Sequence, residues 1–430
     1  MLMTDIIEKK RDKHPLDDKE LEFFVSGVTD KSIPDYQISA LLMAILLNGM
    51  DRRETLTLTT LMAKSGDMLD LSDLSHTADK HSTGGVGDKT TLAVAPIAAA
   101  LGCTVAKMSG RGLGFTGGTV DKLESITGYK TALDTAEFKK IAREHGMCVT
   151  GQSGNFAPAD KRLYAIRDVT ATVNSIPLIA SSIMSKKLAA GAETIVLDVK
   201  FGSGAFMKTA EDAEILAREM VEIGKEAGRK TAAVITDMDV PLGYAVGNAL
   251  EVKEAVRVLK GEGEKNLTSL CILLAAKMYQ ISFDKTEEES IAAARRVTAD
   301  GIAFKRLCAA VKAQGGNEKL LTGEHKFPAA AQTELTAEKD GYITAMNSET
   351  VGKAAVMTGA GRERLGDGID YSAGIILSKK YGDYVQKGER LATLYGAPER
   401  LQNARERLAD AYSIGESKPS DKPIVYKVID

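Results

Sequence analysis

Two glycine-rich segments constrain the fold more than any other feature of this chain. The first, HSTGGVGDKTT at residues 81–91, leads into the apolar stretch LAVAPIAAALG. The second, SGRGLGFTGGT at residues 109–119, follows the strand-like TVAKM and precedes a helix-like stretch. Glycine turns between strands and helices are typical of α/β folds, and such turns expose backbone amides to anions at helix starts. The sequence therefore predicts an α/β fold with two candidate anion-binding loops.

Helical spacing of apolar residues flanks this part on both sides. Residues 1–65 form one such stretch, in which Asp51 and Glu54 have the spacing of a capping box. Residues 159–190 form the other, interrupted near Pro177. We expect a helical domain made of 1–65 plus 159–190. It packs beside an α/β domain of 76–158 plus 191–330, with a cleft between them.

Residues 336–430 form a third, β-rich part. Its expected strands are GYITAMN, AAVMTG and GIILSKK, followed by a turn and strand pair in GDYVQKGERLATLYG. The G-D-x-V-x-K-G pattern resembles the lipoyl/biotinyl-like β-fold, but the M-K-M hairpin of a carrier domain is missing. We therefore interpret this part as a structural appendage. The fold class is α/β, with a helical lobe, a large α/β lobe with a mixed sheet and this β-rich part.

Length and charge exclude several classes of protein. The 430 residues suggest two to four domains, and a net charge of -3 argues against a nucleic-acid or anionic-membrane partner. The four cysteines are far apart and form no zinc motif. Neither a secretory leader nor an apolar run long enough to span a membrane is evident. We expect a cytoplasmic enzyme that needs no organic cofactor.

The first loop invites comparison with a Walker A loop. Counting back from Lys89 and Thr90, however, places Asp88 and Thr83 where the two glycines of that motif belong. One such loop alone could be a plain turn. Both loops combine hydroxyls and glycines with a lysine, which is Lys89 within the first loop and Lys107 just before the second, and together they favour binding of a phosphate.

Longer motifs in the chain resemble those of a known enzyme family. SGRGLGFTGGTVDKLE resembles the signature of the thymidine and pyrimidine-nucleoside phosphorylases, and DKHSTGGVGD is similar to their phosphate loop. LYAIRDVTATVNSIPLIASSIMSKK, LDVKFGSGAFMK and PLGYAVGNALEV extend the resemblance over essentially the whole chain. It implies a fold of the nucleoside phosphorylase/phosphoribosyltransferase type. It also implies reversible phosphorolysis of uridine, thymidine or deoxyuridine to the free base and a pentose 1-phosphate.

The resemblance also implies where the two substrates bind. The phosphate-binding residues would be Lys80, His81, Ser82, Thr83, Thr91, Lys107, Met108, Ser109 and Thr119. The catalytic residues at the base would be His81, Arg167, Ser182 and Lys186, and Tyr164, Leu113, Ile183 and Phe206 would complete the nucleoside site.

Helical spacing supports the base-binding set independently. Ser182 and Lys186 are four residues apart, and Tyr164 and Arg167 are three apart, so each pair can share a helix face. Arg167 and Lys186 could neutralise charge on the departing base. His81, a side-chain type that titrates near neutrality, could donate a proton. Taken singly, Arg167 could instead pair with its neighbour Asp168, and Lys186 could end a solvated helix.

Two positions depart from the family pattern. Phe115 stands where relatives commonly have histidine, and Lys89 stands where close bacterial relatives have a small hydroxyl residue. The second departure bears on potassium, which relatives of this type can bind. The matching potassium ligands here would be Gly87, Leu242, Ala245 and Glu254. One further ligand position of the family would fall on Lys89, whose ammonium would compete with the ion.

Two other functions remain open. An anthranilate phosphoribosyltransferase-like enzyme would share the fold and a glycine-rich loop, but Val86 follows Gly85 where that family has G-T-G-G-D-G. A non-catalytic nucleoside- or phosphate-binding module would keep the loops without turnover. By the resemblance the protein pairs as a homodimer through its helical lobe.

Overall fold

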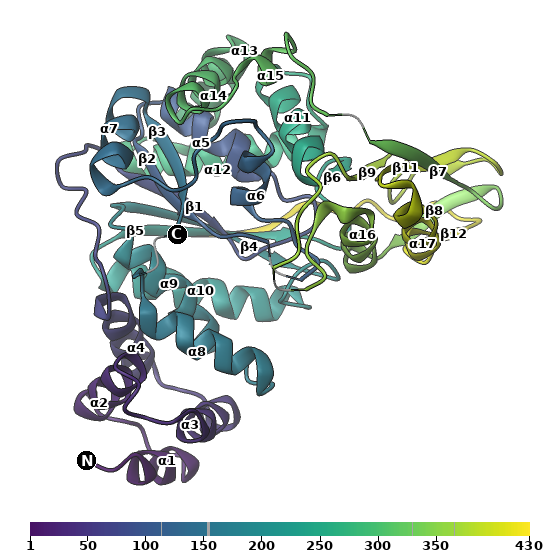
Figure 1. Ribbon diagram of the computed structural model, residues 1–430. Helices are drawn as coiled ribbons and strands as arrows, with labels where there is room; N and C mark the ends of the chain where they lie inside the picture. Colours follow the sequence, from purple (N-terminus) through teal and green to yellow (C-terminus); the bar gives the residue numbers. More distant parts are fainter. Residues whose placement is uncertain (113, 153–154, 329, 365) are drawn as a thin grey trace.

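A computed structural model describes residues 1–112, 114–152, 155–328, 330–364 and 366–430. Figure 1 shows a lower helical lobe, a central α/β part and a β-rich part at the right. Within the described ranges, no helix is both long and apolar enough to cross a membrane.

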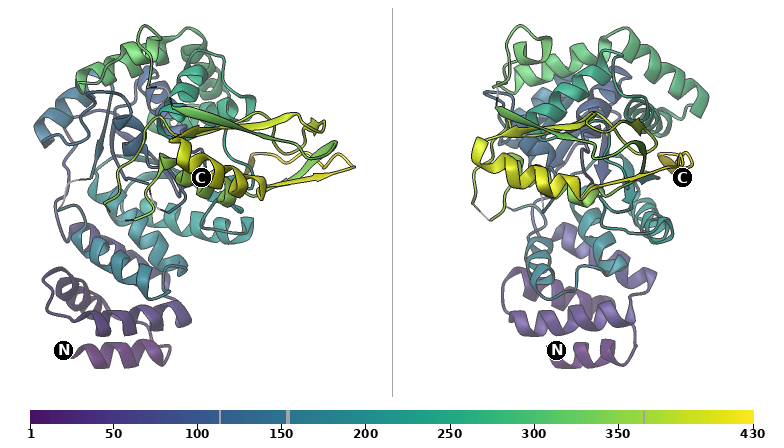
Figure 2. Two further views of the ribbon diagram at one scale, coloured as in Figure 1. Left: turned by 45° about the vertical axis from the view of Figure 1, so that its right-hand side comes forward. Right: turned by 90° about the vertical axis from the view of Figure 1, so that its right-hand side faces the viewer.

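The helical lobe combines two stretches that are far apart in sequence. Figures 1 and 2 place α8 and α9 beside the first four helices, and a shared apolar core joins the two stretches. The Asp51 carboxylate accepts from the Glu54 amide and Glu54 reaches back, so the predicted capping box is confirmed. The helices are α1 (Met3–Arg11), α2 (Asp18–Thr29), α3 (Asp35–Asn48), α4 (Arg52–Lys64), α8 (Pro158–Val169) and α9 (Ile176–Ala189).

The central sheet is mixed, as expected. Its order is β1-β4-β5-β13, with β1, β4 and β5 parallel and β13 antiparallel to β5. A parallel bridge between Thr77 and Thr104 joins its β1 edge to the β2-β3 pair. The strands are β1 (Ala78–Ser82), β2 (Val105–Ser109), β3 (Met147–Gly151), β4 (Thr194–Phe201), β5 (Lys230–Asp237) and β13 (Val425–Ile429).

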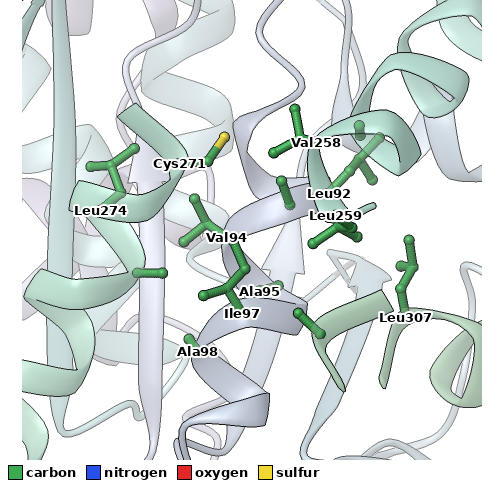
Figure 3. Close-up of a cluster of buried hydrophobic side chains, with 14 of the residues drawn as sticks. Leu92, Val94, Ala95, Ile97, Ala98, Val258, Leu259, Cys271, Leu274 and Leu307 are labelled. Atoms are coloured by element: carbon green, nitrogen blue, oxygen red, sulfur yellow. The ribbon is translucent and has the colours of Figure 1, made fainter. Parts of the chain in front are cut away.

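Two apolar clusters cover the two faces of this sheet. One centres on α5, whose residues are buried on every side because the helix lies inside the cluster (Figure 3). The other lies between the opposite face of the sheet and the helices α9 and α10. The helices of the α/β part are α5 (Thr90–Ala100), α6 (Thr119–Glu124), α7 (Thr135–His145), α10 (Ala210–Glu226), α11 (Asn248–Leu259), α12 (Lys265–Phe283), α13 (Glu287–Ala299), α14 (Ile302–Ala313) and α15 (Lys319–Thr322).

The β-rich part has its own core and two small sheets, ordered β10-β8-β12 and β6-β9-β11-β7. AAVMTG, expected as a strand, is instead the end of an α-helix and most of the π-helical segment Val356–Ala360 that follows it. The Asn347 side chain caps that helix, and Val351, Ala354 and Ala355 are buried at helical spacing. The elements are β6 (Ala245–Val246), β7 (Ala331–Thr336), β8 (Gly341–Met346), α16 (Ser348–Ala355), β9 (Gly374–Leu377), β10 (Tyr384–Val385), β11 (Arg390–Gly396), α17 (Pro398–Ala409) and β12 (Tyr412–Gly415).

Strands cross the expected domain limits at two places. β6 comes from the 191–330 segment but pairs with β9, and β13 comes from the 336–430 segment but pairs with β5. The domain boundaries remain predictions, and the two parts are connected by shared sheets as well as by a linker.

Candidate active site

A cavity of about 620 Å³ lies between the carboxyl ends of the central strands and the helices α8 and α9. β1 continues through α5 to β2 on one side of the sheet, whereas β4 continues through α10 to β5 on the other. Where neighbouring strands connect in opposite directions, a crevice opens at their carboxyl ends. Both glycine-rich loops begin at this edge, so the strand order places them together.

Most of the predicted phosphate-binding residues line this cavity. Lys80 is an exception: its side chain is buried behind the first loop, where its Nζ donates to Thr90 Oγ1 (2.5 Å) and lies 3.0 Å from Asp198 Oδ2. Although burial opposes it, Asp88 and Asp198 raise the pKa of Lys80. The lining residues are His81, Ser82, Thr83, Thr91, Lys107, Met108, Ser109 and Thr119.

Lys107 shares a buried carboxylate with a second lysine. Its Nζ donates to Asp79 Oδ1 (3.0 Å) and to the Lys80 carbonyl (2.5 Å), and Lys187 donates to the other oxygen of Asp79 (2.6 Å). One carboxylate thus balances two ammonium groups. Burial and the neighbouring Lys187 outweigh Asp79 and lower the pKa of Lys107 to about 8. A bound phosphate would supply the missing negative charge.

Asp88, the acidic residue of the first loop, organises the loop from within. Its carboxylate accepts hydrogen bonds from Ser82 Oγ and from Thr90 Oγ1 (2.5 Å). Burial opposes ionisation, but Lys80, Lys200 and Lys122 hold the pKa of Asp88 well below its usual range. The carboxylate is therefore an internal anchor surrounded by positive charge.

The opposite wall carries the predicted base-binding residues of α9. Lys186 Nζ donates to Ser182 Oγ (3.0 Å), so the two residues share a helix face as their spacing predicted. The same ammonium donates to Asp160 Oδ2 on α8 (2.5 Å). Among the described residues, no donor reaches Oδ1 of the buried Asp160. Lys186 is therefore held in place between two helices.

Arg167 fixes the loop between α8 and α9. Its guanidinium is buried and donates to the carbonyls of Thr172 (3.3 Å), Val173 (2.7 Å) and Leu178 (3.0 Å). A guanidinium has more N–H groups than these three bonds use, so Arg167 can still donate to a ligand. Burial lowers the pKa of Arg167 from its ordinary very high value.

His81 lies between the two walls of the cavity, at the end of β1. Burial and the nearby Lys187 and Lys107 push the pKa of His81 well below its usual range. The imidazole is therefore neutral at pH 7, in contrast to the expectation of a group that titrates near neutrality. A neutral imidazole can still donate one hydrogen bond to a substrate carbonyl.

The remaining wall is largely apolar. Tyr164, Ile183 and Phe206 line the cavity as predicted, and Phe206 is the most exposed of them (42%). Leu113, the fourth predicted wall residue, lies outside the described residues. Sequence reasoning missed the lining residues Phe156, Met207 and Leu216.

Comparison with known proteins agrees with this geometry. Residues 74–304, more than half of the chain, match the a/b domain of a glycosyl transferase family, and residues 4–66 match its helical bundle domain. Residues 342–415 match the pyrimidine nucleoside phosphorylase C-terminal domain. Curated pyrimidine-nucleoside phosphorylases are 50% identical to this chain along its whole length. The chain belongs to the pyrimidine-nucleoside phosphorylase family.

Curated relatives in this family match from end to end. A pyrimidine-nucleoside phosphorylase of Staphylococcus epidermidis is 50% identical over 435 aligned residues, covering 100% of both chains. One of Staphylococcus aureus is 50% identical over 432 residues with the same coverage. The anthranilate phosphoribosyltransferase of Thermus thermophilus shares the fold, with a TM-score of 0.60 at 21% identity over 72% of this chain and 98% of that one.

The two departures from the phosphorylase family pattern lie away from the cavity wall. Phe115 packs against the apolar core of the β-rich part. Gly87, Leu242, Ala245 and Glu254, the residues that the resemblance assigned to potassium, gather behind the first loop. The Lys89 ammonium lies among them.

Sequence reasoning missed the carboxylates that support the phosphorylase site. Asp160 lies four residues before Tyr164 and seven before Arg167, so the helical spacing that selected those two could also have selected Asp160. Asp198 offered no such signal: Lys200 lies two residues away on the same strand, but Lys80 reaches Asp198 only once β1 and β4 pair.

Proposed function

We propose that this chain catalyses the reversible phosphorolysis of pyrimidine nucleosides such as uridine, thymidine and deoxyuridine. One observation carries the proposal: a single cavity holds two glycine-rich loops on one wall and Arg167, Ser182 and Lys186 on the other. Two facing walls of this kind suit a substrate pair in which phosphate attacks one end of a sugar while a base leaves from the other. The names of the curated relatives support the same reaction.

The phosphate pole is proposed to act through Lys107 and the loop hydroxyls. A phosphate oxygen forms a bond to C1' of the sugar, and the electron pair of the glycosidic bond moves to the base nitrogen. Ammonium and hydroxyl donors hold the phosphate without competing for C1'. Lys80 would act from behind the loop, because its side chain is in contact with Asp198 and Thr90.

The base pole is proposed to stabilise the departing pyrimidine anion. Lys186 and Arg167 supply positive charge where the ring carbonyls gain negative charge, and Ser182 bonds the ring edge. Such charge-matched donors act most strongly in the transition state. Neutral His81 would donate a hydrogen bond to the carbonyl beside the glycosidic nitrogen. Side chains of this protein thus fill every role in the proposed reaction, which calls for no organic cofactor.

The deciding experiment measures release of uracil or thymine from uridine, thymidine and deoxyuridine, with and without inorganic phosphate. We expect release only when phosphate is present, with pentose 1-phosphate as the second product. Release without phosphate would identify a hydrolase. Binding without turnover would identify a binding module, and magnesium-dependent use of a pyrophosphorylated sugar would identify a phosphoribosyltransferase-like enzyme.

We expect kcat/KM for phosphate to fall at alkaline pH because Lys107 loses its proton. Only the ammonium form binds phosphate well, and its pKa in the free protein is about 8. The value of kcat/KM for phosphate should therefore fall about tenfold per pH unit above that point, at saturating nucleoside. A Lys107→Arg variant, whose guanidinium stays charged, should lose this alkaline limb. A wild-type profile that stays flat to about pH 10 would contradict the assignment.

We also propose a cytoplasmic homodimer that pairs through the helical lobe. Tyr36, Met43 and Leu47 are exposed on one face of α3, at spacings of seven and four residues, which supports an apolar contact there. Cys103, Cys148 and Cys271 are free and buried, which suits a reducing compartment. Sedimentation of the purified protein tests the dimer.

A further inference from the structure

The side chain of Lys89 is buried behind the first glycine-rich loop. Its Nζ donates to the carbonyl oxygens of Leu242 (2.7 Å) and Ala245 (2.7 Å) and to Glu254 Oε2 (2.5 Å). An ammonium has three N–H donors, and each has an acceptor here. These three acceptors belong to residues that the family resemblance assigned to a potassium ion.

The residues present do not fit a potassium ion together with Lys89. Carbonyl and carboxylate oxygens suit potassium, but the ammonium already lies within hydrogen-bond distance of all three. A second cation there would meet strong repulsion in a buried setting. Space is also short: a Cβ on Gly87 would lie 2.7 Å from the Leu242 oxygen and 3.4 Å from Lys89 Nζ.

Lys89 and Glu254 form a direct ion pair in this pocket, and Lys380 lies close enough to act on both charges. Glu254 also accepts from the amides of Tyr244 (2.7 Å) and Ala245 (2.9 Å). Although burial opposes it, the Lys89 ammonium and these bonds keep the pKa of Glu254 below its usual range. One buried carboxylate is thus matched by one buried ammonium.

The contacts of Lys89 connect the phosphate loop to β6, the strand that pairs with the β-rich part. Lys89 directly precedes α5, and its own amide donates to the Gly87 carbonyl (2.9 Å) in the phosphate loop. The Leu242 amide donates to the Val86 carbonyl of the same loop (3.1 Å). Ala245 lies in β6, which pairs with β9 of the β-rich part. The ammonium therefore holds the phosphate loop against β6, the strand that connects the α/β part with the β-rich part.

We propose that the Lys89 ammonium is a tethered replacement for a monovalent cation, so that this enzyme keeps its phosphate loop in place without potassium. Lys89 is then a positioning residue: it acts on phosphate through the loop and does not touch the cavity. A small residue at position 89 would leave two carbonyls and a carboxylate around an ammonium-sized space. The kinetic part of this inference rests on the proposed phosphorolysis, whereas the ion-binding part does not.

The test compares wild type, Lys89→Ala and Lys89→Met in potassium, sodium and tetramethylammonium chloride at equal ionic strength. Both the midpoint of thermal unfolding and the KM for phosphate are measured. Wild type should give the same values in all three salts. Lys89→Ala should unfold earlier and recover in potassium more than in sodium. Its KM for phosphate should rise roughly 10- to 100-fold without potassium and return with it, while the KM for nucleoside stays unchanged.

Lys89→Met is the matched control, because methionine fills the space without carrying charge. It should be destabilised and insensitive to potassium. The inference would be overturned if the wild-type enzyme required potassium rather than sodium. It would also be overturned if a folded Lys89→Ala variant gave the same unfolding midpoint and the same KM for phosphate in all three salts. If Lys89→Ala does not fold, the wild-type comparison still decides. Absence of base release in every salt would reject phosphorolysis, and the unfolding measurements would still test the ion replacement independently.

Discussion

Replacing Lys186 by methionine is expected to lower kcat for nucleoside cleavage by about 10²- to 10³-fold, the usual effect of removing one donor to a developing anion. Methionine keeps the length of the side chain but not its charge. Because the ammonium acts mainly on the departing base, kcat and kcat/KM should fall together. Steady-state rates of base release at saturating phosphate measure the effect.

A second variant separates this loss from simple destabilisation. Lys186→Met leaves the buried Asp160 carboxylate without its ammonium partner. The double variant Lys186→Met/Asp160→Asn removes both charges, so it should recover thermal stability without recovering kcat. Lys305→Met, at an exposed site on α14, is the surface control and should be unchanged. Recovery of kcat in the double variant would mean that Lys186 serves only the structure.

Asp198→Asn is expected to cost about 3–5 kcal/mol in the free energy of unfolding, the range for breaking a buried ion pair. Asp198 is completely buried between Lys80 (3.0 Å) and Lys200 (2.9 Å), and it also accepts from Thr236 Oγ1 (2.7 Å). Asparagine would leave two buried ammonium groups with too little negative charge. The midpoint of urea unfolding reports the change.

The double variant Asp198→Asn/Lys200→Met tests the cause. It removes one positive charge along with the negative one, so it should be more stable than Asp198→Asn alone. If the losses in unfolding free energy of the two single variants simply add in the double variant, Asp198 does not act by balancing the charge of Lys200. An unchanged urea midpoint in Asp198→Asn would contradict the burial argument itself.

Local patterns indicated parts of the site, and the family resemblance supplied most of its residues. The glycine-rich loops, the pairs Ser182–Lys186 and Tyr164–Arg167, and the Asp51 capping box all rest on residues close together in sequence. Their geometry follows from helix periodicity or turn chemistry, which act over a few residues. The same patterns predicted an α/β part flanked by helices, and the family resemblance implied the fold type.

What the sequence could not predict depends on strand pairing over long distances. Asp198 meets Lys80 only because β4 pairs with β1. Lys89 reaches Glu254 across 165 positions, and only the family resemblance, not a local pattern, placed the two residues together. AAVMTG was assigned wrongly for a local reason: its apolar run fits a strand or a buried helix, and the Asn347 cap decides for the helix.

The position of β13 affects the order in which the central sheet can be completed. β13 is the last strand of the sequence, yet it covers the open side of β5 over Val425–Ile429. Until it arrives, β5 presents an unpaired, apolar strand edge of the kind that templates association between chains. The edge of β5 is therefore covered only once Val425–Ile429 have joined the sheet, and a variant truncated before Val425 would leave that edge unpaired.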